Sequence, residues 1–266
     1  MKQAKNPIGA VETTIQLIEA LEHLDGATVT ELSEHLGVTK GTVHNHLATL
    51  REHQYVVNQD GTYTLSLKFL VIGEYLRNNS VLYTNAKAEV EQLAKETGEY
   101  AHLSTEQNGL SQKLHKVQGE NAIGKEYQRA KLQNPDCLHY TATGKAILGS
   151  LPRKRVETII DHYGLPERTK HTITDRGELF ETIETIRDRG YALNDEEEVE
   201  RMRAVGAPIC DKDGTVLGAV SVSGPISRMK NEQFREVLPE KVMNTATVIE
   251  MNVSMSERSG NLPRYE

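Results

Sequence analysis

The stretch that most constrains the fold of this chain runs from Thr28 to Asn58 and reads TVTELSEHLGVTKGTVHNHLATLREHQYVVN. Its pattern predicts two helices joined by a tight turn. Thr30 is expected to cap the first helix and Gly37 to end it, because glycine adopts positive φ without strain. Thr39 is expected to cap the second helix, whose apolar stripe recurs at spacings of four and three residues, at Val43, Leu47 and Leu50.

The opposite face of the second helix carries polar donors and acceptors, at Lys40, Thr42, His44, Asn45 and His46. A helix with one packed face and one such polar face suits insertion into the major groove of DNA, where base edges are read by hydrogen bonds. An ordinary helical hairpin has the same spacing, so the flanking elements decide between the two interpretations.

Two flanking elements favour DNA binding. A preceding helix is predicted because apolar residues recur every three or four positions, at Ile8, Val11, Ile15, Ile18, Leu21 and Leu24. A hairpin is predicted to follow over Tyr55–Leu65, with Asp60-Gly61 as its turn. Three helices and a hairpin make a winged helix–turn–helix, whose wing would lie near the DNA backbone or minor groove through Gln59, Asp60 and Thr62.

The charge of the chain predicts weak non-specific DNA binding. The chain has 31 Lys and Arg against 38 Asp and Glu, a formal net charge of −7. Residues 1–79 share this bias, with six Lys and Arg against nine carboxylates. Neutralisation of phosphates by cations supplies essentially all of the non-specific affinity of DNA-binding proteins.

The chain is predicted to contain two folded parts. Helices are expected over 66–79 and about 81–97, and Asn78-Asn79-Ser80 breaks them. We place the domain boundary at this break. The predicted parts are a winged helix–turn–helix domain over 1–66, a linker helix over 67–80, a second domain over 81–255 and a disordered tail over 256–266.

From Tyr100 onward the periodicity changes, and strands alternate with helices. Strand pairs are predicted around an Asn108-Gly109 turn and an Asp213-Gly214 turn. The intervening helices are expected after the loop Thr141–Gly144, over 153–163, from an Asp175 cap to Arg189, and over Asn231–Met251. This order predicts an α+β domain built on an antiparallel sheet.

Two features of this second domain predict a small-ligand pocket. Strand alternation over Thr215–Ser223 places Leu217, Ala219, Ser221 and Ser223 on one face of the sheet, and Val216, Val220 and Val222 on the other. The hydroxyls of Ser221 and Ser223 are then roughly 7 Å apart and point the same way. The Thr141–Gly144 loop opens a helix, where small side chains let a ligand approach backbone N–H groups. Together these suit a small carboxylate; the alternative is that the hydroxyls satisfy buried backbone groups.

Taken together, these pieces resemble the IclR family of transcription regulators, over about Ile8 to Met251. Four stretches carry the resemblance: TKGTVHNHLATL (39–50), LHYTATGKAIL (138–148), GYALNDEE (190–197) and GAVSVSGPISR (218–228). The resemblance implies an N-terminal winged helix, a linking helix and a C-terminal effector-binding domain related to GAF and PAS sensors. It also implies an effector among organic acids and aromatic or sugar-derived acids.

Carried over to this sequence, the family's pocket positions are Ala142, Thr143, Asn194, Met202, Ala204, Ser221 and Ser223, with Gly144 as part of the same loop. Asn194 stands where an Asp is frequent in the family, and Ala204 stands where some members have a Cys. A neutral amide and a smaller apolar residue should alter ligand choice, so the identity of the effector does not transfer. Asp195 would take the polar role if the register shifted by one residue.

Other signals do not support catalysis or metal binding. Gly119 to Lys125 matches the start of a P-loop, but Glu126 stands where Ser or Thr must hold magnesium. The serines of the last strand lack a GxSxG elbow and a histidine tied to them by spacing, so we predict no catalytic residue and no enzyme. Cys137 and His139 supply two metal ligands where a structural zinc site needs about four. We therefore expect no metal and no cofactor, and two free thiols, at Cys137 and Cys210.

The sequence contains no signal for a membrane or for secretion. Its apolar runs are far shorter than the roughly 20 residues of a membrane-spanning helix, and no signal-peptide core follows Met1. We therefore expect a cytoplasmic protein that does not associate with a membrane.

The sequence as a whole predicts a transcription regulator that responds to a small carboxylate effector. A single half-site is short, and each mismatched base pair weakens binding by only about 1–3 kcal/mol. We therefore expect a homodimer or a dimer of dimers on a palindromic operator in double-stranded DNA, with Asn45 reading adenine and Lys40 contacting guanine or phosphate. The alternatives are a metabolite-processing enzyme with a fused DNA-binding or docking module, and a DNA-binding protein with a vestigial sensor.

Overall fold

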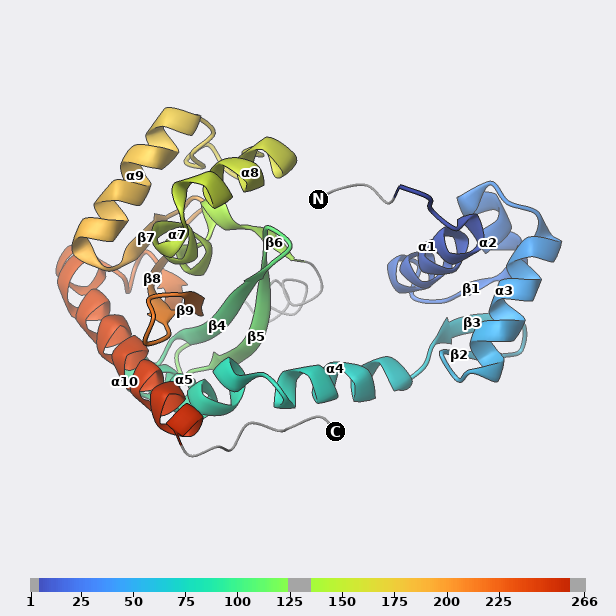
Figure 1. Ribbon diagram of the computed structural model, residues 1–266, viewed down its shortest axis with the longest axis horizontal. Helices are drawn as coiled ribbons and strands as arrows, with labels where there is room; N and C mark the ends of the chain where they lie inside the picture. The colour runs from blue at the N-terminus through green and yellow to red at the C-terminus, as the bar shows by residue number, and fades with distance from the viewer. Residues whose placement is uncertain (1–4, 124–134, 259–266) are drawn as a thin grey trace. The chain divides into compact units, whose positions relative to one another are not determined.

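The computed structural model describes residues 5–123 and 135–258. The chain divides into two compact units, Met1–Asn78 and Asn79–Glu266, and the division falls at the Asn78-Asn79-Ser80 break. Each unit combines helices with an antiparallel sheet (Figure 1), which confirms the predicted α+β class. Within the described ranges, no helix is long and apolar enough to cross a bilayer.

The first unit has the element order of a winged helix–turn–helix: α1 (Gly9–His23), β1 (Ala27–Thr28), α2 (Val29–Leu36), α3 (Lys40–Glu52), β2 (Val56–Gln59), β3 (Thr62–Leu65) and α4 (Lys68–Asn78). The predicted hairpin is confirmed, since β2 pairs antiparallel with β3. Asp60 and Gly61 have φ values of 51° and 90°, and two successive positive φ values are what a type I′ turn requires. Strand β1 adds a third member, paired with β3, that is too short to give a periodic signal.

The caps of the helix pair are partly as predicted. Gly37 ends α2 with φ 68°, and the Thr39 hydroxyl accepts from the Thr42 N–H at the start of α3. The predicted Thr30 cap is wrong, because α2 begins two residues earlier. Thr28 is its N-cap and forms a capping box with Glu31, each side chain accepting from the other residue's backbone N–H.

The buried face of α1 differs from the predicted apolar stripe. Leu17, Ala20 and Leu21 are buried against the core of the unit, whereas Ile8, Val11 and Ile15 are about half exposed or more. Periodicity predicts that a helix is amphipathic but not which of two adjacent apolar stripes faces its neighbours. In α1 the contacts with α2 and α3 select the Leu17 side.

The second unit is built on a six-stranded antiparallel sheet of order β6-β5-β4-β9-β8-β7. Its strands are β4 (Tyr100–Gln107), β5 (Leu110–Gln118), β6 (Asp136–Cys137), β7 (Ala192–Asp195), β8 (Met202–Cys210) and β9 (Val216–Pro225). One apolar cluster joins the sheet to α5 (Val81–Thr97), η2 (Gln233–Val237) and α10 (Leu238–Arg258). A second cluster lies among the short helix η1 (Leu138–Tyr140), α7 (Ala142–Ser150), α8 (Arg153–Tyr163) and α9 (Arg176–Arg189). These two groups of helices are seen at different sides of the sheet in Figure 1.

The predicted alternation along β9 holds from Ala219 onward and fails before it. Val220 and Val222 belong to the cluster with α5 and α10, and Ala219 belongs to the cluster with α7 to α9. Leu217, however, packs with the Val220 side and Val216 with the Ala219 side. The pairing explains this, because Ile209 opposes Gly218 and Cys210 opposes Val216. Leu217 is therefore the extra residue of a bulge, which reverses the faces of the residues that precede it.

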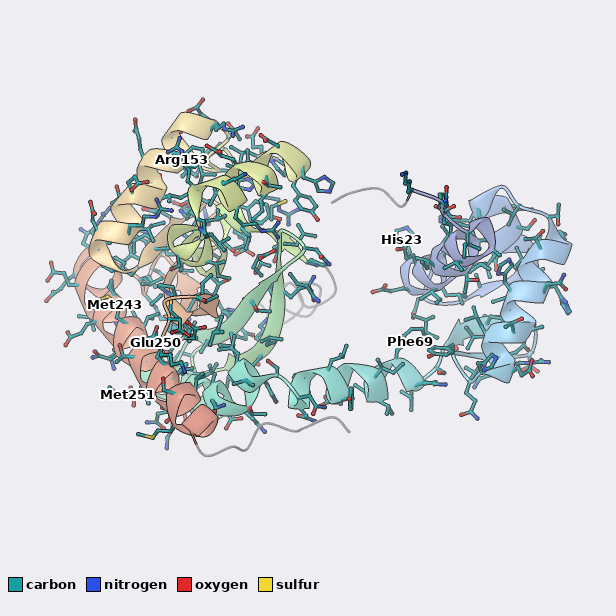
Figure 2. The ribbon with its side chains drawn as sticks, viewed as in Figure 1. His23, Phe69, Arg153, Met243, Glu250 and Met251 are labelled. Carbon is teal, nitrogen blue, oxygen red and sulfur yellow. The ribbon has the colours of Figure 1, made fainter. Side chains whose placement is uncertain are left out.

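The C-terminal helix is longer than predicted. Helical structure starts at Asn231, passes through the π-helical turn η2 and continues in α10 to Arg258. Residues 256–258 therefore belong to the helix, whereas 259–266 lie outside the described residues. Glu250 lies on α10 (Figure 2), and its carboxylate accepts from the Cys210 N–H at the end of β8, at 2.7 Å.

Candidate DNA-binding and effector sites

The face of α3 predicted to meet DNA is exposed at three of its five positions. Lys40, His44 and Asn45 are exposed to solvent. The other side of the helix is anchored by Val43 and Leu47, which are fully buried in the core of the first unit. The helix therefore presents two amino-terminal turns of polar side chains from a rigid support.

The remaining two positions of that face make contacts within the unit. The Thr42 hydroxyl lies 2.9 Å from the Thr39 hydroxyl and so takes part in the cap of α3. The His46 ring is partly buried, and its Nδ1 lies 2.8 Å from the Thr14 hydroxyl on α1. His46 therefore links the two helices, a contact that helical spacing alone does not predict.

The wing residues flank the tip of the hairpin. Gln59 and Thr62 oppose each other across β2 and β3, and both are exposed. The Asn58 side chain accepts from the Gly61 N–H at 3.2 Å, which orders the turn between them.

In the second unit, a pocket lies at the amino-terminal end of α7 against the sheet. It brings together five of the nine predicted effector-binding residues: Ala142, Thr143, Ala204, Ser221 and Ser223. It also contains residues that sequence reasoning did not identify, from β4, β5, β6 and the loop after β7: His102, Ser104, Ser111, Lys113, Asp136 and Glu198. Thr141, the N-cap of α7, completes the lining.

His102 is the histidine partner that spacing could not supply. Its Nε2 lies 2.8 Å from the Ser223 hydroxyl, and both side chains are buried. The two residues are 121 positions apart and become neighbours only because β4 pairs with β9, with His102 opposite Ser221. The sequence signal for His102 was weak: it and Ser104 lie two residues apart in a predicted strand and therefore share one face of it.

The start of α7 uses some of the backbone donors that a ligand would need. The Thr141 hydroxyl accepts from the Gly144 N–H at 3.0 Å, and the Thr141 carbonyl accepts from the Lys145 N–H at 2.9 Å. A Cβ on Gly144 would lie 2.2 Å from the Leu138 carbonyl oxygen, so this glycine allows close packing of η1 on α7. The residues that line the pocket from the first turn of α7 are Ala142 and Thr143.

Three other predicted residues do not line the pocket. The Asn194 side chain donates to the Tyr140 carbonyl and accepts from the Glu197 N–H, at 2.5 and 3.1 Å. Asp195 forms a two-armed ion pair with Arg203. Met202 lies at the start of β8, opposite Pro225. Their contacts hold β7 and β8 in place beside the pocket.

Among the described residues, an ion pair joins two members of the pocket lining, Lys113 on β5 and Asp136 on β6. The Tyr140 hydroxyl donates to the same carboxylate at 3.4 Å. Burial raises the pKa of the Tyr140 phenol, and the negative charge of Asp136 raises it further. The same two causes raise the pKa of the Cys137 thiol, which therefore stays protonated at neutral pH.

A second, deeper ion pair joins α7 to the loop after β7. The ammonium of Lys145 contacts the Glu197 carboxylate, and both residues are buried. Burial lowers the pKa of Lys145 and raises the pKa of Glu197, and their mutual attraction opposes both changes. One oxygen of Glu197 has no hydrogen-bond partner among the described residues. The ion pair anchors Glu197, and the next residue in the chain, Glu198, lines the pocket.

The pocket is narrow. Its cavity volume is about 20 Å³, which is room for about one water molecule. A ligand must therefore displace a side chain to enter.

Cys137 and His139 do not form part of a metal site in the described portion of the chain, where no group of three or more His, Cys, Asp or Glu could hold a metal ion. The His139 ring instead donates from Nε2 to the Pro166 carbonyl at 3.1 Å. The P-loop-like segment extends past Ile123 and so lies partly outside the described residues.

The fold and the two sites define a two-part regulator, with a winged helix–turn–helix in one unit and a polar pocket in a separate α+β unit. Comparison with known proteins agrees. The IclR helix-turn-helix domain matches residues 10–60, and the C-terminal domain of bacterial transcriptional regulator IclR matches residues 74–251. The chain belongs to the IclR family of transcriptional regulators, which confirms the predicted resemblance and its regulatory, non-enzymatic function.

Relatives and solved structures cover nearly the whole chain. A Halobacterium salinarum protein named "Probable HTH-type transcriptional regulator ArcR" is 38% identical over 247 residues, covering 92% of this chain and 94% of that protein. The crystal structure of Thermotoga maritima IclR has a TM-score of 0.73 at 26% identity, covering 92% of this chain and 97% of that one. An IclR homologue from Microbacterium hydrocarbonoxydans, crystallised with 4-hydroxybenzoate, has a TM-score of 0.78 at 16% identity, covering 92% and 98%.

Proposed function

We propose that this regulator binds a palindromic operator as a homodimer and that a small carboxylate in the second unit alters that binding. The observation that carries the DNA-binding part is the exposed face of α3, formed by Lys40, His44 and Asn45 on a buried support. We further propose that the protein acts on DNA in the cytoplasm.

In this proposal Asn45 reads an adenine through a bidentate hydrogen bond, and Lys40 contacts a guanine or a phosphate. Gln59 and Thr62 place the wing against the backbone or minor groove. Thr42 and His46 support α3 from within the unit, because their side chains already bond to Thr39 and Thr14.

The test compares Asn45→Ala with Gln16→Ala, an exposed polar residue on α1. The operator is first selected from random DNA with the wild-type protein. Loss of one bidentate contact should reduce discrimination at one base position by about 1–3 kcal/mol, with little change in thermal stability. Unchanged discrimination by Asn45→Ala would refute the groove assignment, and an equal loss in Gln16→Ala would show a non-specific effect.

The dimer is supported by apolar surface on the first unit. Helix α4 buries none of its residues within the chain. Exposed large apolar side chains on α4, on α1 and at the N-cap of α1 include Ile8, Val11, Ile15, Leu70, Val71, Ile72 and Leu76. Surfaces of this kind mark protein–protein contacts, and a two-fold dimer matches a palindromic site.

The oligomeric state is tested by light scattering after gel filtration. The double substitution Leu70→Glu and Leu76→Glu should convert the wild-type assembly to a smaller one and abolish operator binding at the same protein concentration. Lys87→Glu, an exposed position on α5, is the control. A wild-type protein that is monomeric at micromolar concentration would refute the dimer.

The effector role is supported by the buried hydroxyls of Ser221 and Ser223 beside the first turn of α7. The crystallisation of one homologue of similar fold with 4-hydroxybenzoate, a small carboxylate, supports this role. Ser221→Val should abolish the effect of ligand on operator affinity and leave operator binding itself intact. A normal response would refute the pocket assignment, and no response of the wild type to any carboxylate would indicate a vestigial sensor.

A further inference from the structure

We propose that Lys113 is the residue that recognises the effector's carboxylate, that the effector takes the place of Asp136 on it, and that the effector is a hydroxylated aliphatic acid. The inference rests on the proposed sensor function and adds to it the cation, the internal competitor and the class of ligand. None of the residues carried over from the family resemblance has a cationic side chain.

The chemistry of the lining argues for a hydroxylated rather than an aromatic ligand. Among the described residues that line the pocket, the only apolar side chains are the methyl groups of Ala142 and Ala204. The others are polar: six hydroxyls, an imidazole, an ammonium and two carboxylates. The edge of an aromatic ring offers no hydrogen bonds to a polar lining, and its entry would desolvate that lining without compensation. The hydroxyl groups of an aliphatic acid can both donate to and accept from such a lining.

The charges of the lining argue for Lys113 as the anchor. Lys113 is the only Lys or Arg among the described lining residues, which also include two carboxylates, those of Asp136 and Glu198. Its side chain is 9% exposed, and that of Asp136 is 13% exposed. An acid entering this site meets repulsion unless it takes over the Lys113 ammonium. Asp136 therefore acts as an internal competitor that occupies the place of the ligand carboxylate.

The topology makes Asp136 the partner that can move. Strand β6 has two residues and lies at the edge of the sheet, where it pairs with Leu110 and Ser111 of β5. Lys113 lies on β5, which pairs with β4 along eight positions. Moving Asp136 breaks few hydrogen bonds, and it provides the room that the narrow pocket lacks. Because β6 leads directly into η1 and α7, exchange at Lys113 would also shift the start of α7.

The test compares the affinity of an acid with that of its amide, because the two ligands differ in charge but have nearly the same shape. The probes are D-gluconate against D-gluconamide and lactate against lactamide, with benzoate as the aromatic comparator. Dissociation constants are obtained by thermal-shift titration of the full-length protein. The variants are Asp136→Asn, Lys113→Gln, the double variant Lys113→Gln/Asp136→Asn, Lys113→Arg, and Lys95→Gln as a control at an exposed position on α5.

The expected results have opposite signs for the two partners. The wild type should bind an acid more tightly than its amide, and Asp136→Asn should bind the acid about tenfold more tightly than the wild type does. In Lys113→Gln the ratio of amide to acid dissociation constants should fall by a factor of about 10 to 100, the loss expected for a charge-assisted hydrogen bond. The double variant leaves neither charge buried without its partner, and it should also show no preference. Lys113→Arg and Lys95→Gln should retain it.

Several outcomes overturn the inference. These are an equal affinity for acid and amide in the wild type, weaker acid binding by Asp136→Asn, a preference that survives in the double variant, benzoate binding more tightly than gluconate, or no binding of any probe. Operator titrations separate the two proposals. If acids bind through Lys113 but leave operator affinity unchanged, the sensor function fails and the Lys113 assignment stands. If operator affinity responds to a ligand whose binding ignores Lys113, only the present inference fails.

Discussion

The buried pair of Lys145 and Glu197 gives the sharpest prediction about stability. Lys145 is 2% exposed and Glu197 7% exposed. Replacing Lys145 by Met keeps a long unbranched side chain at this buried position of α7, but it leaves the carboxylate of Glu197 buried without its cation. Removing one partner of such a pair destabilises a protein by about 3–5 kcal/mol. Lys145→Met should therefore lower the free energy of unfolding of the second unit by that amount.

The double variant Lys145→Met/Glu197→Leu separates an unpaired charge from a packing defect. Replacing both partners by apolar residues of similar size is often neutral or stabilising, so this variant should be at least about 2 kcal/mol more stable than Lys145→Met. The orphan oxygen of Glu197 favours this result, because the double variant removes it. The backbone of residue 197 stays anchored, since its carbonyl accepts from Thr172 at 2.7 Å.

The penalty in Lys145→Met should also depend on pH, with a definite sign. Without its cation, Glu197 keeps the burial that raises its pKa and loses the attraction that most opposes it, leaving only the hydrogen bond from the Asp195 N–H to lower the pKa. A carboxyl whose folded-state pKa lies above its unfolded value adds stability below the unfolded pKa and loses it as pH rises through the folded pKa. Lys145→Met should therefore be closer to the wild type at pH 5 than at pH 8.

The assay is urea unfolding of the full-length protein, followed by far-UV circular dichroism at both pH values, with Lys95→Met on the exposed face of α5 as the control. The chain has two compact units, so two unfolding transitions can occur. The transition that shifts in Lys145→Met but not in Lys95→Met is assigned to the second unit. A loss below about 1 kcal/mol in the single variant, or a double variant as unstable as the single one, would refute the reasoning.

Three further predictions concern positions away from this pair. Burial lowers the pKa of His139, and a group whose pKa is lowered in the folded state contributes stability that is lost as pH falls through its folded-state pKa. The free energy of unfolding, measured by urea titration, should therefore fall less between pH 7 and pH 5 in His139→Gln than in the wild type. Gly144→Ala places a methyl group 2.2 Å from the Leu138 carbonyl and should destabilise the second unit by about 1–3 kcal/mol; a melting temperature equal to that of the wild type would contradict the packing. Thr39→Ala removes the cap of α3 and should lower the stability of the first unit by about 1 kcal/mol, whereas Thr39→Ser should retain most of it in the same melt.

Local features of the fold were predictable because their causes lie within a few residues. The Asp60-Gly61 and Asn108-Gly109 turns have the positive φ values that their residue types favour. Asp175 caps α9 through the Glu178 N–H as its spacing indicates. Where prediction failed locally, two candidates competed at close range, as with the Thr28 and Thr30 caps.

The sequence by itself determined the class of protein: a winged helix with a polar outer face, followed by an α+β unit in which two serines point from one strand toward a helix start. These conclusions follow from periodicities and caps, which act over three or four residues. Only the tertiary structure decided which residues make the pocket. His102 joins Ser223 through the pairing of β4 with β9, and Lys113 meets Asp136 through the pairing of β5 with β6. The physical reason is that sheet order is set by burial of the whole apolar surface, which no short stretch of sequence encodes.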